Sequence, residues 1–160
     1  MAVTEATLVY LIDRERVCLG YKTRGFGAGK WNGFGGKVED GETREETAVR
    51  ELQEETGVSV SLRDLDYVAE LYFHNGAGEA GDMHVHAFFT GQWDGEPREI
   101  EKMRPQWFGF GEVPYADMWP SDPHWFPRVL KGERVRCAVW FDARGERVLR
   151  HQVARMQGTN

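Results

Sequence analysis

Short apolar runs rich in β-branched and aromatic residues recur along the chain and predict strands. The first covers residues 8–12, and residues 16–20 form its hairpin partner across a turn at residues 13–15. Further strands are predicted at residues 58–60, 67–73, 83–90, 107–110, 134–141 and 147–153. After the first hairpin, residues 25–36 are dense in glycine, which permits close approach of the backbone to a ligand.

Two segments carry the end signals of helices. A capping box that begins at Thr43 predicts a helix to about Thr56, and Gly57 suits its left-handed end. The second helix is predicted to begin at residues 121–123, where the proline occupies the first turn, and to end at Gly132. Two helices can cover the faces of one sheet, so the pattern predicts a layered α+β domain.

Composition excludes several classes of protein. The 160 residues, 41% of them hydrophobic, fit one globular domain over residues 1–160. The net charge of −6 argues against binding of duplex nucleic acid, but not against a free nucleotide whose charge is carried on bound metal. Cys18 and Cys137 form no zinc-spaced pair and no disulfide framework, which indicates a reducing compartment. With no signal peptide and no apolar run of about 18 residues, we expect a cytoplasmic monomer that does not contact the membrane.

Three glutamates converge on one face of the first predicted helix. At about 100° per residue, Glu51, Glu54 and Glu55 fall within about 100° of arc, while Val49 and Leu52 point to an adjacent buried face. Packing three anions together is unfavourable, because like charges repel and raise each other's pKa. A hard divalent cation removes that cost, and magnesium is readily shared between carboxylates and phosphates. The arrangement therefore indicates phosphate-ester chemistry. A solvated helix face is the alternative for any one pair of these glutamates.

The strip from Gly36 to Val58 matches the pattern G-x5-E-x7-R-E-U-x-E-E-x-G-U, where U is a bulky aliphatic residue, at every defined position. On this motif the chain resembles the Nudix hydrolases. The resemblance implies an α/β/α sandwich with a mixed central sheet and two main helices, and attack by water on a nucleoside diphosphate linkage. It also implies that Mg²⁺, or Mn²⁺ in its place, is held by the Gly36 carbonyl and by Glu51, Glu54 and Glu55. Arg50 then orients a catalytic carboxylate through a bidentate pair.

The likeness extends beyond that motif to one branch of the family, the MutT homologues that hydrolyse oxidised purine nucleoside triphosphates. The segments that carry it are residues 24–29, 31–38, 103–105, 107–108, 117–120 and 125–127. This resemblance implies a free purine nucleoside triphosphate as substrate, with a nucleoside monophosphate and pyrophosphate as products.

The same resemblance implies a base site. Asn32 matches an amide that bonds the purine edge, Trp119 matches an aromatic platform for the base, and Asp122 is suited to accept from the N–H groups of an oxidised guanine. Further positions expected near the nucleotide are Thr7, Lys22, Phe26, Phe73 and Met83. The alternatives are a turn residue at Asn32, a helix cap at Asp122, and simple core for the three apolar side chains.

Two positions depart from the branch. Ser121 replaces the first of two adjacent aspartates, so recognition of 2-hydroxyadenine is less secure than that of oxidised guanine. Lys102 stands where the family often has a glutamate near the metals, with Glu99 and Glu101 close by. Either Glu101 substitutes or the helix carboxylates suffice, and the general base stays open. Other hypotheses are hydrolysis of alkylated purine nucleotides, ordinary dNTPs or dinucleotide polyphosphates, and a binding module without turnover.

His84 and His86 alternate along a predicted strand and therefore share one face. The sequence offers no clear third ligand beside them, because His74 is remote. The pair is interpreted as strand surface rather than as a zinc site.

Overall fold

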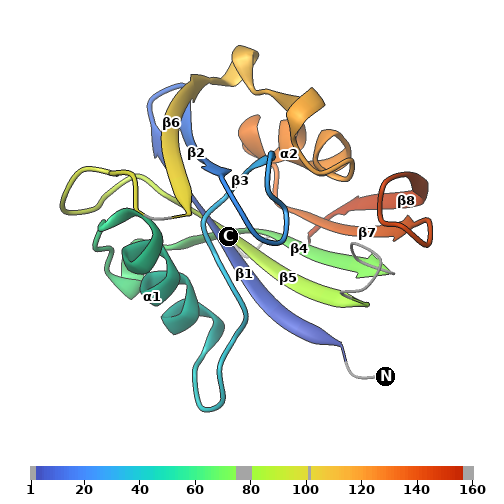
Figure 1. Cartoon of the computed structure of the whole chain (residues 1–160), viewed down its shortest axis with the longest axis horizontal. Helices are drawn as coiled ribbons and strands as arrows, with labels where there is room; N and C mark the ends of the chain where they lie inside the picture. The colour runs from blue at the N-terminus through green and yellow to red at the C-terminus, as the bar shows by residue number, and fades with distance from the viewer. Residues whose placement is uncertain (1–2, 75–80, 101, 157–160) are drawn as a thin grey trace.

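A mixed eight-stranded sheet lies between two helices in the computed structural model, which describes residues 3–74, 81–100 and 102–156 (Figure 1). The strand order is β3-β2-β1-β5-β4-β7-β8, and β6 pairs with β2. The bounds are β1 (Thr4–Asp13), β2 (Arg16–Lys22), β3 (Trp31–Asn32), α1 (Arg44–Thr56), β4 (Asp66–His74), β5 (Met83–Thr90), β6 (Met103–Gly109), α2 (Asp122–Leu130), β7 (Val135–Phe141) and β8 (Val148–Arg155). The predicted sandwich with a mixed sheet and two main helices is confirmed.

Helix α1 begins and ends as its sequence predicts. The Glu46 amide donates to Thr43 Oγ1 at 3.1 Å, and the Thr43 amide donates to Glu46 Oε1 at 2.9 Å, so the capping box is complete. Gly57 closes the helix with a φ of 81°. Its buried face includes Ala48 and Leu52.

Three predictions of strands are corrected. Residues 58–60 form no strand; only Ser59 makes an isolated bridge, to Asp94. Strand β6 begins four residues earlier than predicted, since its whole length pairs with β2, and Phe110 belongs to a short 3-10 helix instead. The two-residue β3 was not predicted. Each difference depends on pairing with distant segments, which overrides local propensity.

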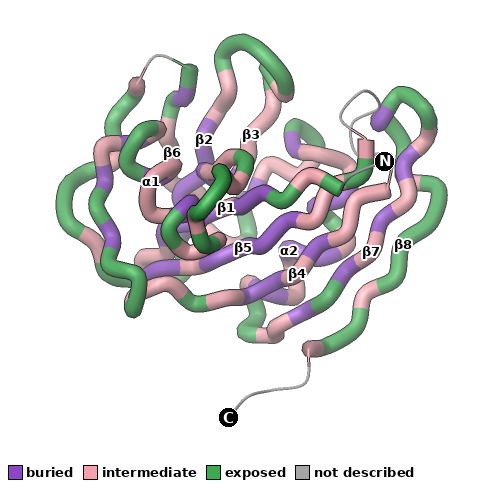
Figure 2. Tube along the Cα trace, turned by 90° about the horizontal axis from the view of Figure 1, so that it is seen from below, coloured by how far each residue is buried: buried purple, intermediate pink, exposed green. Residues whose placement is uncertain are grey.

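Two apolar clusters fill the two sides of the sheet. One lies between the sheet and α2 and includes Tyr10, Trp125 and Phe126, while the other lies under α1 and includes Val9 and Leu52. The central strands β1, β5 and β4 are largely buried, whereas β8 is mostly exposed (Figure 2). No helix in the described ranges is long and apolar enough to cross a membrane.

Strand β1 changes partner along its length. It pairs with β2 only from Leu11 to Asp13, and beyond that point residues 34–38 run beside it instead. Val9 and Phe34 exchange backbone hydrogen bonds, and the Thr7 amide donates to the Gly36 carbonyl at 2.9 Å. The loop that precedes α1 is therefore fixed by the central sheet.

Candidate active site

The anchored loop brings the Gly36 backbone against the glutamates of α1. A Cβ added at Gly36 would lie 2.5 Å from Glu51 Cδ, closer than a side chain permits. A Cβ at Gly35 would lie 1.8 Å from the Thr7 carbonyl oxygen. These glycines are needed because the loop is held tightly between β1 and α1. The structure thus brings the Gly36 backbone and the Glu51 carboxylate together, as the sequence predicts.

Two of the three helix carboxylates are partly buried. Glu55 accepts a hydrogen bond from the Gly35 amide at 2.8 Å, and burial raises the pKa of Glu55 to about 7, with the neighbouring Glu51 adding to the rise. Burial also raises the pKa of Glu51. Glu54 is more exposed, with 58% of its side chain accessible. Loss of solvation and mutual repulsion therefore disfavour the ionised form of Glu51 and Glu55.

Arg50 binds several carboxylates, and its bidentate partner is Glu42. Arg50 Nε donates to Glu42 Oε2 at 2.6 Å and Nη2 donates to Glu42 Oε1 at 3.0 Å, which holds the pKa of Glu42 at about 2. A single bond of 2.8 Å joins Arg50 Nη1 to Glu51 Oε1. Arg50 therefore positions Glu51 from a guanidinium that Glu42 fixes in place.

These groups fit a hard divalent cation. Glu51, Glu54 and Glu55 supply carboxylate oxygens and the Gly36 carbonyl supplies a further one, which is the oxygen-only set that Mg²⁺ prefers. Burial, with a smaller contribution from repulsion by the neighbouring carboxylates, raises the pKa of Glu51 and of Glu55, so their negative charge is costly in the folded protein. A bound cation would relieve that charge.

A cavity of about 110 Å³ opens beside Glu55 and extends under the glycine-rich loop. Its lining contains one carboxylate, two lysines, one amide and two aromatic rings. The lining residues are Leu8, Lys22, Phe26, Gly27, Lys30, Asn32, Gly33, Gly35, Glu55, Met103 and Trp119. A larger and more open hollow lies on the outer side of α1, where residues such as Arg50, Gln53 and Glu54 line it.

The aromatic and amide groups of the cavity suit a flat heterocycle. The Phe26 and Trp119 rings lie 5.5 Å apart with an angle of 30° between them, and Lys30 Nζ lies 5.3 Å from the Trp119 ring. Phe26 is 57% exposed, so it is not core. Asn32 Oδ1 accepts from the Gly33 amide at 2.9 Å, and no residue in the described ranges accepts from its Nδ2. That Nδ2 group is the donor available to a ligand.

Asp122 lies in the first turn of α2, immediately behind Trp119. Its Oδ1 accepts from Trp125 Nε1 at 3.2 Å, whereas Oδ2 is buried and has no hydrogen-bond partner in the part of the chain described. Burial raises the pKa of Asp122 to about 7. The Tyr10 hydroxyl is buried and unpartnered within the same ranges. Such groups cost about 1–3 kcal/mol each when left unpaired, so they indicate a place for water or ligand.

Several expected positions lie elsewhere. Phe73 and Met83 pack against the α2-side core and do not line the cavity. Thr7 is buried, and its hydroxyl lies 3.5 Å from the Gly36 carbonyl, so it contacts the metal-site loop. Lys102 is exposed, and Glu99 lies 3.7 Å from Arg104. Glu101 falls outside the described residues.

Sequence reasoning missed three residues. Glu42 is the first glutamate of the matched pattern, and its spacing from Arg50 was the available signal. Lys30 ends the glycine-rich segment, and its cation–π contact with Trp119 depends on a loop that the sequence does not fix. Tyr10 sits in an apolar run that gives no sign of an unpaired hydroxyl.

Comparison with known proteins identifies the family. The model of the NUDIX domain matches residues 3–129. The chain is 49% identical to the oxidized purine nucleoside triphosphate hydrolase of Mus musculus and 48% identical to that of Danio rerio, each over 128 residues that cover 80% of this chain and 80% of the relative. A crystal structure of a MutT protein from Bacillus halodurans has the same fold, with a TM-score of 0.81 over 94% of this chain and 97% of that chain at 24% identity. With its signature helix, its anchored loop and these relatives, the chain belongs to the Nudix family.

Proposed function

We propose that this protein hydrolyses oxidised purine nucleoside triphosphates, of the 8-oxo-dGTP type, to the monophosphate and pyrophosphate. The relatives from mouse and zebrafish carry the name of that activity at nearly half identity over most of both chains. One observation of the structure supports this activity most: the cavity that is lined by Asn32 and Trp119 is also lined by Glu55 of the signature helix. A nucleotide base in that cavity would therefore place its phosphates toward the carboxylates.

The roles of the residues follow from their contacts. Trp119 and Phe26 provide aromatic surface for the base, where stacking contributes about 1–3 kcal/mol. Asn32 Nδ2 donates to the purine edge, and Asp122, whose amide donates to the Trp119 carbonyl at 3.0 Å, offers its unpaired Oδ2 as an acceptor. Lys22 lines the same cavity and carries a positive charge suited to ribose or phosphate oxygens.

The phosphate end depends on α1. Glu51, Glu54, Glu55 and the Gly36 carbonyl form the proposed site for Mg²⁺, or for Mn²⁺ in its place. Such an ion neutralises charge on phosphoryl oxygens and lowers the pKa of bound water. Arg50 holds Glu51 in position, and the Gly35 amide holds Glu55. Thr7 fixes the Gly36 carbonyl from the opposite side.

The substrate assignment is tested by steady-state kinetics with pyrophosphate detection. We expect kcat/KM for 8-oxo-dGTP to exceed that for dGTP by about tenfold or more, the discrimination that one paired hydrogen bond supplies. Equal kcat/KM values for the two nucleotides would exclude a preference for oxidised purines but not nucleotide hydrolysis itself. Complete inactivity across a broad panel with either metal, combined with tight nucleotide binding, would favour a binding module instead.

Ser121 bears on which other purine nucleotides the protein accepts. It is 1% exposed and cannot act as a second carboxylate beside Asp122, so purines that need two such groups should be poorer substrates. The panel therefore includes 2-hydroxy-dATP and alkylated purine nucleotides. We further propose that the protein acts in the cytoplasm, since its two cysteines form no disulfide framework, and that it acts as a monomer.

A further inference from the structure

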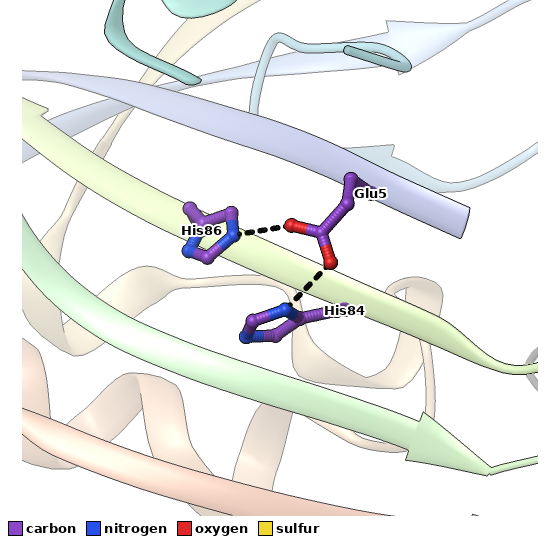
Figure 3. A group of neighbouring side chains, drawn as sticks. All are labelled: Glu5, His84 and His86. Carbon is purple, nitrogen blue, oxygen red and sulfur yellow. Dashed lines mark hydrogen bonds and ion pairs between the residues drawn. The ribbon is translucent and has the colours of Figure 1, made fainter. Parts of the chain in front are cut away.

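A second group of metal-ligating side chains lies on the α1 side of the sheet, where β1 and β5 run in parallel. Glu5 and His84 are direct partners in the strand register, and His86 follows two residues later on the same face. Glu5 Oε2 lies 2.7 Å from His84 Nδ1 and Glu5 Oε1 lies 2.9 Å from His86 Nε2 (Figure 3). One ligand atom from each of the three residues lies within 4.8 Å of the others.

The sequence interpretation of strand surface is therefore corrected. His86 is 3% exposed and therefore not on the strand surface, and Glu5 supplies the third group of metal-ligating type that the sequence alone did not provide. Because β1 and β5 are central strands, their backbones hold the three side chains at a fixed spacing. The exposed Glu5 carboxylate, 47% accessible, leaves a path from solvent.

Each imidazole is also oriented by its outer nitrogen. His84 Nε2 lies 2.8 Å from Glu70 Oε2, and His86 Nδ1 lies 2.7 Å from the Tyr67 hydroxyl. The inner nitrogens, His84 Nδ1 and His86 Nε2, then face Glu5. Hydrogen bonds from the outer nitrogen to a carboxylate or hydroxyl fix the tautomer and ring orientation of histidines that bind metals. The Tyr72 ring stacks on His84 at 4.2 Å and restricts it further.

We propose that Glu5, His84 and His86 bind a zinc-class transition metal ion at a site separate from the helix carboxylates. Two imidazole nitrogens and one carboxylate oxygen match Zn²⁺, Co²⁺ or Ni²⁺, with water in the fourth position, whereas Mg²⁺ prefers oxygen alone. Ligand atoms on a tetrahedral zinc lie about 3.3 Å apart, given bonds of about 2.0–2.1 Å. The present separations of 2.7 and 2.9 Å reach that spacing through small side-chain rotations.

The charged groups around Glu5, His84 and His86 limit the affinity of this cluster for a metal ion. Arg44 Nη1 lies 3.3 Å from His86 Nδ1 and can only donate, so it disfavours the proton that this nitrogen carries when an ion binds Nε2, while Arg136 pairs with Glu70 at 2.7 Å. The network already satisfies its hydrogen bonds as a set of ion pairs. Because the Glu5 carboxylate only accepts, a bound ion has to displace the protons on His84 Nδ1 and His86 Nε2 together with these two contacts, while the outer nitrogens keep Glu70 and Tyr67 as partners.

Metal binding is measured on the whole protein after chelator treatment, by competition with a chromophoric zinc chelator. Excess Mg²⁺ is present throughout to occupy the helix carboxylates. The wild-type protein should bind one Zn²⁺ per chain in competition. With Co²⁺ it should show the visible absorption of a four-coordinate site, and Zn²⁺ should raise its Tm.

Four variants locate the ion. His84→Ala and the milder Glu5→Gln, which keeps a polar group against the imidazoles, should each weaken zinc binding by at least about 10-fold and lose the cobalt spectrum. His151→Ala removes an imidazole from the other stacked pair, which it forms with His124 at 3.9 Å, and should bind zinc as the wild type does. Glu54→Gln should likewise keep the zinc stoichiometry.

Three results would overturn the proposal. One is the absence of competing Zn²⁺ binding by the wild type, and another is equal zinc affinity in the wild type, His84→Ala and Glu5→Gln. The third is loss of zinc in Glu54→Gln alone, which would place the ion on the helix carboxylates. None of these readouts depends on nucleotide hydrolysis, so they test the metal site independently of the proposed enzymatic function.

Discussion

Asp122 is expected to contribute to the pH dependence of stability in this protein, and Asp122→Asn should remove that contribution. The side chain is 3% exposed, and burial outweighs its hydrogen bonds from Trp125 and Ser121 and the charge of Lys30, raising its pKa from 3.8 to about 7. Between these two values the folded protein keeps a proton that the unfolded chain has lost. The free energy of unfolding therefore falls as pH rises through this window and levels off above about pH 7.

The size of the effect follows from the rise in pKa. From 3.8 to about 7, at about 1.4 kcal/mol for each unit of pKa, it corresponds to about 4 kcal/mol. About 3 kcal/mol of this falls between about pH 5 and pH 8.5. Asparagine keeps the shape and an oxygen for Trp125 Nε1 but does not ionise. Relative to the wild type, Asp122→Asn should thus gain about 3 kcal/mol across that range.

The assay is urea unfolding followed by circular dichroism, without nucleotide, at several pH values between about 5 and 8.5. Glu55, whose pKa is also raised to about 7, contributes equally to both proteins and cancels in the difference. Asp142→Asn is the matched control, because the backbone amides of Glu146 and Arg147 lower the pKa of Asp142. The lowered pKa affects stability only at more acid pH than the range measured. The difference in unfolding free energy between Asp142→Asn and the wild type should therefore not change with pH. A flat difference for Asp122→Asn as well would refute the reasoning.

The remaining predictions concern turnover. Glu54→Gln should lower kcat by at least about 100-fold with an unchanged circular dichroism spectrum, since it removes a proposed metal ligand; near-normal turnover would contradict the metal assignment. Trp119→Ala should raise KM by roughly 5–150-fold, equivalent to about 1–3 kcal/mol of lost stacking, with little change in kcat; an unchanged KM would place the base elsewhere. Arg50→Lys cannot make the bidentate pair with Glu42 and should lower kcat more than it raises KM; wild-type kinetics would argue against a positioning role. Chelation with EDTA should abolish hydrolysis, and added Mg²⁺ or Mn²⁺ should restore it; activity that survives chelation would exclude a dependence on these ions.

Helix α1 could be predicted from the sequence because its signals are local. The capping box at Thr43, the stop at Gly57 and the angular spacing of the glutamates all lie within one short segment. The strands were predicted by their apolar runs, and their ends were less accurate. Residues 58–60 have strand composition but no strand partner along their length, because pairing is decided by the rest of the sheet.

The second metal-ligating group shows why other features could not be predicted. Glu5 and His84 are separated by 79 positions, and they meet only because β1 and β5 pair in parallel with one register. The bidentate pair of Arg50 and Glu42 likewise depends on the course of the loop before α1. Local patterns identify which residues can do chemistry, whereas the sheet register determines which of them meet.

The two ends of the sheet bear on how the protein behaves at high concentration. Strand β8 forms one end, and its exposed side chains include Arg150, His151 and Arg155, while the other end is β6, which pairs with β2 along its whole length and contains Arg104 and Pro105. A charged edge repels a second copy of itself, and a proline in an edge strand lacks the backbone N–H that pairing needs. Strand addition between molecules, the first step toward ordered aggregates, is therefore disfavoured at both ends.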